Sequence, residues 1–369
     1  MKGFAHHVVV LGVVLAGLAV RPAGAWDRGE VENFATIPSF TPSGGACPNG
    51  ATSCTSDIEG VAVGPDGAVY APSFGFNSDG ALSGSGELFV FSPGGQLIRH
   101  FVVAGSSPHL IGLVYQQSSN SLLIADLGAG KVRKVNLKIQ ATTMFTAAPN
   151  PAAAGLNALT IAKKGNVYVS DSFQGIIWRT GPGGGTPTAW YSPANQNDLL
   201  LPTANDNERL IPPFGANGIA SNNEGAAMFV MNTAYHSIIK IPIPVRPDGS
   251  AGDGAVFTTG LNAPDGVAVD RDDNLWVVAN QGDEIVVVDP NGKAIAKGGD
   301  FNGLSHDGSI KGLLFPASPS FSPDGKVLYV TNLALYLPIA GVSEIAVDSA
   351  WTLQVKHYNV AKIELEDSD

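Results

Sequence analysis

The sequence predicts an all-β protein, folded as a single six-bladed β-propeller with four-stranded blades. Its 369 residues include 45 Gly and 25 Pro but only 14% charged residues, a composition that suits many short strands joined by tight turns. A hairpin-like segment also recurs six times, with steps between 46 and 60 residues. A repeat of about 50 residues with one hairpin per unit is typical of a β-propeller.

The clearest copy is residues 264–280, which read PDGVAVDRDDNLWVVAN. Two apolar runs, residues 267–269 and 275–278, flank a polar turn at residues 270–274, which is the pattern of a β-hairpin. The other copies share this layout. Aligned on Asp265, the six units begin at Glu59, Ile111, Asn157, Asn217, Asp265 and Ala317.

Most units continue into a second hairpin half, as at residues 176–178, 238–241 and 284–292, which gives four strands per blade. Each blade buries its faces only against its neighbours, so the ring must close. We expect the strand-like residues 31–37 and 355–365 to share one blade and join the two ends. A β-sandwich or two smaller β domains are the alternatives, but no Pro/Ser-rich linker divides the chain.

Three inserts interrupt the rhythm, at residues 77–85, 181–214 and 301–313. Long connections of this kind are typical of rim loops, which commonly line a site.

Residues 1–25 have the features of a signal peptide. Lys2 is followed by an apolar stretch at residues 8–20 and by Ala23-Gly24-Ala25, which fits a cleavage site. The alternative is a membrane anchor, but an apolar run of about 13 residues is short for spanning a bilayer. We expect a secreted or periplasmic protein, with the propeller at residues 26–369 and no stable membrane insertion after cleavage.

The chain has two cysteines, Cys47 and Cys54, both after the signal segment. In an oxidising compartment they are expected to form a small disulfide loop. A metal pair or two free thiols are the alternatives. The absence of further Cys and of an adjacent His argues against zinc.

The net charge is −11, and it becomes −13 when Lys2 and Arg21 leave with residues 1–25. Such an acidic balance argues against nucleic acids and anionic membranes as partners. We expect a monomer that acts on a small molecule.

Four of the six equivalent positions carry a side-chain oxygen: Glu59, Asn157, Asn217 and Asp265. Equivalent positions in a propeller ring face the axis at one mouth, so these oxygens should converge. Carboxylate and amide oxygens are the ligands of a hard cation. We expect Ca²⁺, which tolerates irregular cages, ahead of Mg²⁺, Mn²⁺ or Zn²⁺. The alternative is that Asp-Gly and Asn-Gly pairs here only form turns.

The motifs Glu59-Gly60, Asn157, Asn217-Gly218 and Pro264-Asp265-Gly266 resemble those of the gluconolactonase/regucalcin (senescence marker protein) family, which is related to paraoxonases and strictosidine synthase-like proteins. The resemblance covers about residues 59–332. It implies a six-bladed propeller with one divalent metal on its axis. It also implies that Glu59, Asn217 and Asp265 are metal ligands and that Asn157 touches the metal or the substrate.

Two departures concern the substrate. The sugar-lactone enzymes of this family carry an Arg shortly before the third-blade Asn, whereas residues 154–156 here are Ala-Gly-Leu. The first-blade motif also lacks a Pro-x-Trp after Glu59. The resemblance therefore extends to the metal cage but does not identify the substrate.

The family likeness implies a metal-dependent lactonase or esterase, in which Asp265 acts as general base. His109, close to Ile111, and His306, beside Asp307, are the histidines placed to contact substrate or shuttle protons. Each is alternatively an ordinary loop histidine. The chain has no G-x-S-x-G and no H-E-x-x-H motif.

A non-catalytic propeller is the main alternative function. It would bind a small ligand or a protein partner and use the axial metal only to tie blades together. A carbon–carbon bond-forming activity, as in the strictosidine synthase relatives, is a third possibility that no residue of the chain specifically supports.

Overall fold

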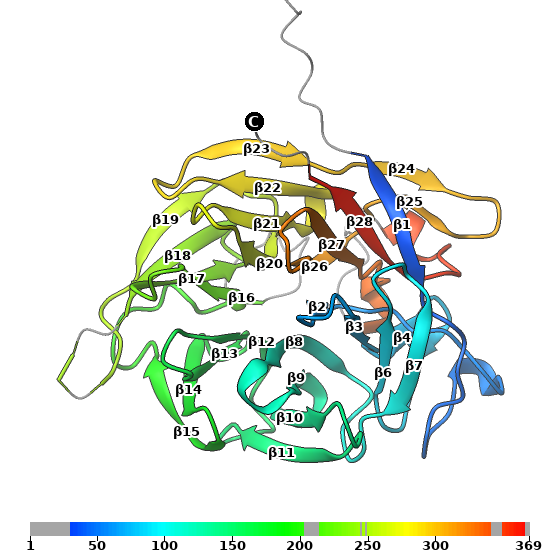
Figure 1. The fold of residues 1–369 in the computed structure, drawn as a ribbon, viewed down its shortest axis with the longest axis horizontal. Coiled ribbons are helices and arrows are strands. Elements are labelled where there is room, and N and C mark those ends of the chain that lie inside the picture. Colours follow the sequence, from blue (N-terminus) through cyan, green and yellow to red (C-terminus); the bar gives the residue numbers. More distant parts are fainter. Residues whose placement is uncertain (1–29, 203–213, 244–245, 248, 341–348, 366–369) are drawn as a thin grey trace, which may run out of the picture.

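Six four-stranded antiparallel sheets surround a central axis, as the repeats predict (Figure 1). The computed structural model describes residues 30–202, 214–243, 246–247, 249–340 and 349–365. The predicted signal segment, residues 1–25, lies outside the described residues. The first strands of the blades surround the axis, and each contacts the first strands of both neighbouring blades.

In five blades the strands run in chain order from the axis outwards, and the sixth differs only in its outermost strand, which comes from the N-terminal side of the ring. In the first three blades they are β2 (Ala62–Val63), β3 (Val69–Pro72), β6 (Glu87–Phe91) and β7 (Leu97–Val102); β8 (Leu110–Gln116), β9 (Ser121–Asp126), β10 (Lys131–Asn136) and β11 (Thr142–Ala147); and β12 (Leu156–Ile161), β13 (Val167–Asp171), β14 (Ile176–Gly181) and β15 (Gly184–Tyr191). In the last three they are β16 (Ala216–Ser221), β17 (Ala227–Asn232), β18 (Ser237–Pro242) and β19 (Ala255–Thr259); β20 (Pro264–Val269), β21 (Leu275–Ala279), β22 (Glu284–Val288) and β23 (Ala294–Gly298); and β26 (Pro316–Phe321), β27 (Val327–Asn332), β28 (Asn359–Glu364) and β1 (Val31–Thr36).

The sixth blade closes the ring with both ends of the chain, as predicted. β1 is its outermost strand and pairs with β28, with Val31 opposite Ile363. β28 in turn pairs with β27. Because β1 supplies the last strand of a blade that is otherwise C-terminal, the first and last segments of the chain are held in one sheet.

The core consists of apolar layers between adjacent blades. The second strands are almost wholly buried, and every residue of β9 and β17 is buried. One layer joins Tyr70 and Leu88 of the first blade to Leu113 and Leu122 of the second. Each blade thus buries its faces against its neighbours, which is why no single blade is an independent unit.

The inserts contribute structure of their own. Two are short hairpins: β4 (Phe76–Asn77) with β5 (Gly80–Ala81), and β24 (Phe301–Leu304) with β25 (Ile310–Gly312). The prediction of an insert at residues 181–214 was wrong in its first part, because β15 is the fourth strand of the third blade. Its pairing with β14 outweighs a local sequence rich in Gly.

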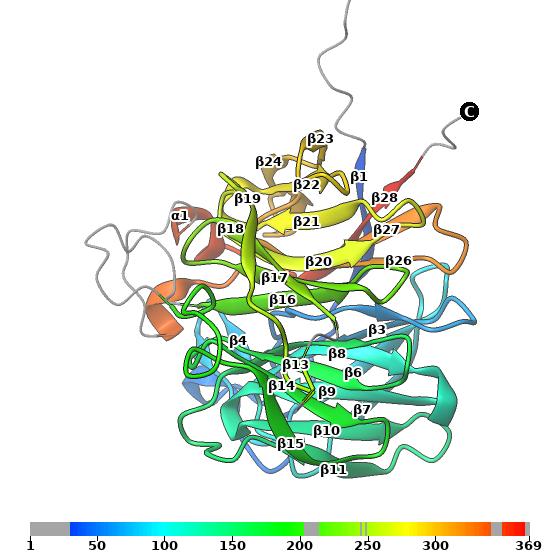
Figure 2. The ribbon, with the colours of Figure 1, turned by 90° about the vertical axis from the view of Figure 1, so that its left-hand side faces the viewer.

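The helical elements among the described residues are short. They are the 3₁₀ turns η1 (Pro48–Gly50), η2 (Gln117–Ser119), η3 (Leu127–Ala129), η4 (Asn280–Gly282) and η5 (Leu337–Ala340), and one helix, α1 (Ser349–Thr352). α1 lies on one face of the ring (Figure 2). Within the described residues, no helix is long and apolar enough to cross a membrane.

Cys47 and Cys54 form the predicted disulfide, and both are paired. It closes the loop that precedes Glu59.

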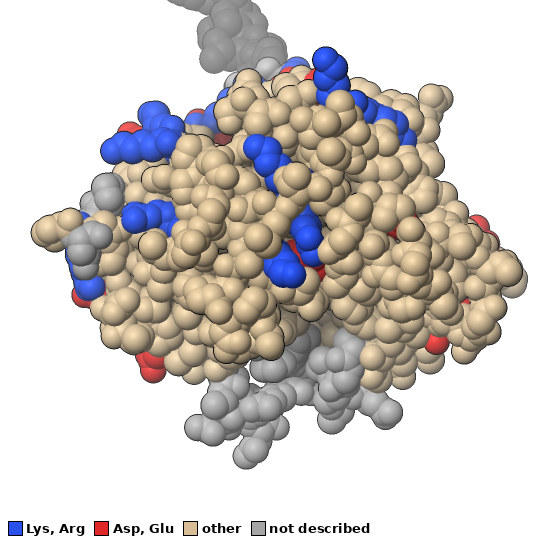
Figure 3. Space-filling view, turned by 90° about the horizontal axis from the view of Figure 1, so that it is seen from below, with Lys and Arg blue, Asp and Glu red and all other residues tan. Residues whose placement is uncertain are grey.

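On the face of the ring shown in Figure 3, Lys and Arg occur in small separate groups over a largely uncharged surface.

Candidate functional site

Each blade has a backbone irregularity where its first strand meets the axis. The pairing of β12 with β13 shifts by one residue between Leu156 and Leu159, and the same shift occurs in β8, β16, β20 and β26. Such bulges re-aim side chains. Asn157, Asn217 and Asp265 each lie inside one of these bulges. Glu59 has the equivalent place in the first blade, between the Ile58–Ser73 bridge and Ala62.

A glycine follows the axial residue in four blades because the next blade is too close for a side chain. A Cβ on Gly112 would lie 2.6 Å from the carbonyl oxygen of Asn157, and one on Gly218 would lie 2.1 Å from that of Asp265. Gly60 and Gly266 have equivalent contacts. These glycines let adjacent first strands touch backbone to backbone, which draws the axial side chains together.

The four predicted ligands line one cavity, and each has a buried oxygen without a hydrogen-bond partner. Glu59 Oε2, Asn157 Oδ1, Asn217 Oδ1 and Asp265 Oδ1 are buried and have no hydrogen-bond partner. Their side chains are at most 6% exposed. Buried polar atoms are normally paired, so four unpaired oxygens in one cavity are the mark of a site that accepts a positively charged group.

The protonation of the two carboxyls fits the same conclusion. Burial raises the pKa of Asp265 to about 8, although the amides of Asn217 and Asn280 partly oppose the rise. Burial also raises the pKa of Glu59 well above its usual value, and the nearby Asp265 carboxylate raises it further. Burial of both carboxyls and repulsion between them disfavour the charged forms, and a bound cation would offset both effects.

These residues fit a divalent cation. The described residues include no group of three or more His, Cys, Asp or Glu placed to hold a metal, so a cage here depends on amide oxygens as well as carboxylates. Two carboxylates with two amide oxygens form a hard, all-oxygen donor set, which suits Ca²⁺ or Mg²⁺ better than softer metals.

Two supporting residues escaped the prediction, Thr233 and Asn280. Thr233 Oγ1 accepts a hydrogen bond from Asn217 Nδ2 (2.9 Å) and donates to the carbonyl of Pro264 (2.8 Å). Asn280 Nδ2 donates to Asp265 Oδ2 (3.1 Å) and to the carbonyl of Pro316 (2.8 Å). Each follows the second strand of its blade, so the repeat register that identified the axial residues also contains this signal.

His109 lies on the wall of the cavity. Its ring stacks on Phe76, with centroids 4.6 Å apart, and Nδ1 lies 2.8 Å from the carbonyl oxygen of Phe74. Since a carbonyl only accepts, Nδ1 carries the proton in this contact and Nε2 of the neutral ring is left as an acceptor. The prediction that His109 is near the axial mouth is therefore consistent with its position.

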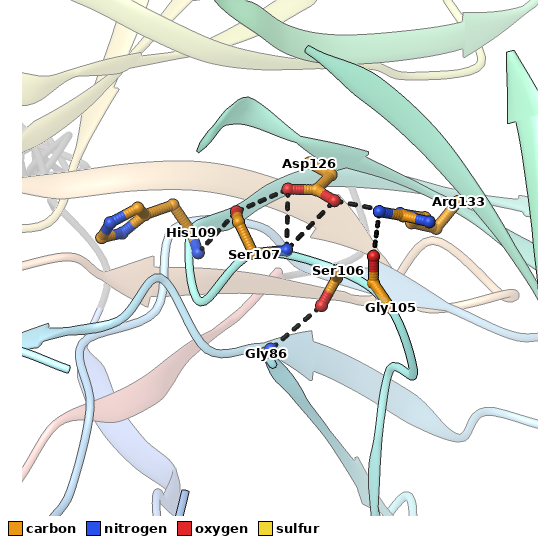
Figure 4. Close-up of polar contacts among 7 residues, drawn as sticks. All are labelled: Gly86, Gly105, Ser106, Ser107, His109, Asp126 and Arg133. Atoms are coloured by element: carbon orange, nitrogen blue, oxygen red, sulfur yellow. Dashed lines mark hydrogen bonds and ion pairs between the residues drawn. The ribbon is translucent and has the colours of Figure 1, made fainter. Parts of the chain in front are cut away.

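A buried ion pair holds the loop that carries His109 (Figure 4). Asp126 is fully buried and pairs with Arg133 (3.0 Å) while accepting hydrogen bonds from Ser107 Oγ (2.5 Å) and Ser107 N. Ser107 Oγ in turn accepts from the His109 backbone N–H (3.2 Å). The histidine ring points away from this network, which fixes its backbone and leaves the ring free of the ion pair.

His306 has no place in the cavity. It is exposed in the turn between β24 and β25, where Asp307 accepts a hydrogen bond from Ser309 N (3.0 Å). The insert that carries it packs beside β1, on the outer side of the sixth blade. His306 is therefore not carried into the functional proposal.

The cavity has a volume of about 190 Å³. Its polar residues are the four predicted ligands with His109, Thr233 and Asn280. The rest of the lining is apolar: Phe74, Phe76, Ile111, Leu127, Phe173, Phe214, Phe315, Leu333, Leu335 and Leu337.

Comparison with known proteins gives the family and the fold of the chain. The family model described as the SMP-30/gluconolactonase/LRE-like region matches residues 102–298, more than half of the chain. No curated protein sequence matches the chain.

Among solved structures, regucalcin from Agrobacterium tumefaciens is similar at 17% identity and a TM-score of 0.58, covering 90% of this chain and 94% of that one. A gluconolactonase from Xanthomonas campestris is similar at 15% identity and a TM-score of 0.54, with 85% and 96% covered. Virginiamycin B lyase from Staphylococcus aureus is similar at 14% identity and a TM-score of 0.53, with 84% and 96% covered. These likenesses show the fold, which hosts more than one chemistry.

Proposed function

Because the chain belongs to the SMP-30/gluconolactonase/LRE-like family, we propose that it is an exported, metal-dependent hydrolase. It hydrolyses a lactone or related ester at a divalent cation on the propeller axis. Ca²⁺ is the first candidate for this cation. The observation that carries the proposal is the set of four unpaired buried oxygens, from Glu59, Asn157, Asn217 and Asp265, in one cavity.

A cation held by these oxygens would polarise the ester carbonyl and lower the pKa of an attacking water. The Asp265 carboxylate would receive the proton of that water, while Asn280 donates a hydrogen bond to its Oδ2. His109 Nε2 is a second proton acceptor in the same cavity, oriented by the contact of Nδ1 with the Phe74 carbonyl. Asn157, which has an unpaired oxygen, orients the metal or the substrate.

Export is supported by the Cys47–Cys54 disulfide, since such bonds persist in oxidising compartments. The signal-like residues 1–25 agree with it. The partner we propose is a small molecule, because the polar side chains that the repeats gather line a cavity.

The test is hydrolysis of a panel of lactones and aryl esters by the purified protein with Ca²⁺, Mg²⁺, Mn²⁺, Zn²⁺ or EDTA. We expect turnover that EDTA abolishes and Ca²⁺ restores. Asp265→Asn keeps the size of the side chain but removes a charge and the proton acceptor, so it should abolish turnover. Asp272→Asn, in the exposed turn of the same blade, should not change it.

Calorimetry separates the two main functions. If millimolar divalent cation does not bind, both the metal cage and the hydrolase mechanism are wrong. If the cation binds but no lactone or ester is hydrolysed, the axial metal is structural and the protein is a binding propeller.

A further inference from the structure

The cavity is divided into a polar floor and apolar walls. Its carboxylates and amides come from the axial bulges and the residues beside them, whereas the walls consist of five Phe, four Leu and one Ile. The Phe173 and Phe214 rings stack with centroids 5.7 Å apart, and the Phe76 ring stacks on His109. A ligand that reaches the floor therefore lies between hydrocarbon surfaces.

Most of the hydrogen-bond donors in the cavity are already used by the protein. Asn217 Nδ2 donates to Thr233, the Thr233 hydroxyl to the Pro264 carbonyl, and Asn280 Nδ2 to Asp265 and Pro316. His109 Nδ1 donates to the Phe74 carbonyl. The unpaired atoms are oxygens on the floor, so the walls offer little to a ligand with many hydroxyls.

Among the described residues that line the cavity, none is Lys or Arg. Gly155, in the Ala-Gly-Leu run at residues 154–156, lies against the aromatic wall. A Cβ on Gly155 would be 2.6 Å from the Phe173 ring. The absence of a side chain at Gly155 thus makes room for a phenyl ring beside the floor.

The volume of the cavity limits the size of the ligand. An apolar cavity of about 150 Å³ lined by Leu, Ile and Phe binds benzene, and this one measures about 190 Å³. It holds a single ring with a short substituent.

We infer that the ligand of this cavity is a monocyclic lactone or small ester with an apolar alkyl or aryl substituent, and that the cavity rejects polyhydroxylated sugar lactones. The inference rests on the proposed function for the reacting bond and on the apolar walls for the substituent. Hydroxyls placed against Phe and Leu would lose their hydrogen bonds to water without replacement. An alkyl chain gains affinity with each methylene that it buries, by roughly fourfold.

Binding of lactams tests the inference without any turnover, because lactams resist hydrolysis. The full-length protein in millimolar Ca²⁺ is titrated by calorimetry with 6-methyl-, 6-ethyl- and 6-propylpiperidin-2-one and with glucono-δ-lactam. We expect affinity to rise by roughly fourfold per methylene, and the propyl lactam to bind on the order of a hundredfold more tightly than the sugar lactam. Equal or tighter binding of the sugar lactam, a flat alkyl series, or no lactam binding overturns the inference.

Phe173→Ser locates the effect on the wall. Phe173 is 45% exposed and follows β13, so its loss should leave the fold intact, while the alkyl lactams bind roughly tenfold more weakly. Tyr235→Ser is the matched control, since Tyr235 is 53% exposed and follows β17 in the next blade but does not line the cavity. The two variants should have similar melting temperatures. An equal loss of affinity in both, or in neither, contradicts the assignment of Phe173.

Turnover of the corresponding lactones is measured separately. If alkyl lactams are preferred but no lactone or ester is hydrolysed, the proposed function is wrong and the ligand class stands. If glucono-δ-lactone is hydrolysed and its lactam binds best, the hydrolase proposal stands and the inference is wrong.

Discussion

Blades two and six have the same axial bulge as the other blades, but they place Ile111 and Ala317 where the others place a side-chain oxygen. The backbone bulge that turns a residue towards the axis is therefore common to the ring. The side chain at that one position decides whether a blade contributes an oxygen to the cavity. Glu59 lies between the two apolar blades, while Asn157, Asn217 and Asp265 come from three consecutive blades. The small Ala317 is all that the intervening blade puts between the two carboxylate-bearing blades, one and five.

The largest loss of stability is expected from substitution of the glycine that follows the axial residue, which polar and apolar blades both contain. Gly218→Ala would bring a Cβ to 2.1 Å from the Asp265 carbonyl oxygen, and Gly112→Ala would bring one to 2.6 Å from that of Asn157. The backbone atoms of the next blade cannot move aside as the end of a flexible side chain can. Each substitution should therefore lower the free energy of unfolding by about 3 kcal/mol or more. The loss should be similar in both variants, although Gly112 belongs to an apolar blade and Gly218 to a polar one.

Denaturant unfolding measures this loss, and Gly181→Ala is its control because nothing lies within 4 Å of its added Cβ. Unchanged stability in Gly218→Ala would show that the first strands do not touch as described.

Calcium should stabilise the protein only while the polar blades are intact. At a free Ca²⁺ concentration a hundred times the dissociation constant, binding adds about 2.7 kcal/mol to the free energy of unfolding. We expect a matching rise in melting temperature that EDTA reverses in the wild type. Glu59→Gln should remove most of it, and an undiminished rise in that variant would exclude Glu59 from the cage.

The stability of the metal-free protein should fall as pH rises. Because burial raises the pKa of Asp265 to about 8 in the folded state, the folded chain keeps a proton that the unfolded chain loses above about pH 4. The unfolded state then binds fewer protons, and stability decreases by up to about 1.4 kcal/mol per pH unit between those values.

Thermal unfolding in EDTA between pH 4 and pH 8 measures this slope. Asp265→Asn should flatten it, and so should saturating Ca²⁺. An identical slope in the variant would show that Asp265 does not titrate as its burial implies.

The smallest loss of stability is expected from a substitution in an apolar blade. Ile111 is 4% exposed and packs in the core cluster beside the cavity, so Ile111→Val should cost about 1 kcal/mol of stability. Its metal affinity should equal that of the wild type, as measured by calorimetry. A changed affinity would mean that the apolar blades also shape the cage.

The repeats allowed the ring, its closure and the four axial residues to be predicted, because equivalent positions in equivalent blades must lie at equivalent depths. They did not reveal the role of the Phe74 carbonyl or the Phe76 ring in orienting His109, since those contacts join different blades. β15 was missed because its Gly-rich strand is selected by pairing with β14. His306 was considered for substrate contact but lies outside the cavity, because the repeats do not determine the path of an insert.

The closure of the ring also sets an order of events during synthesis. β1 is made before the other strands of the ring, whereas its partner in the sixth blade, β28, follows more than 320 residues later in the chain. At ordinary elongation rates of roughly 5–20 residues per second, β1 waits for tens of seconds without its sheet. During that time β1 is an unpaired strand open to other chains, and the charge of Glu32 near its start makes it a poor template for them.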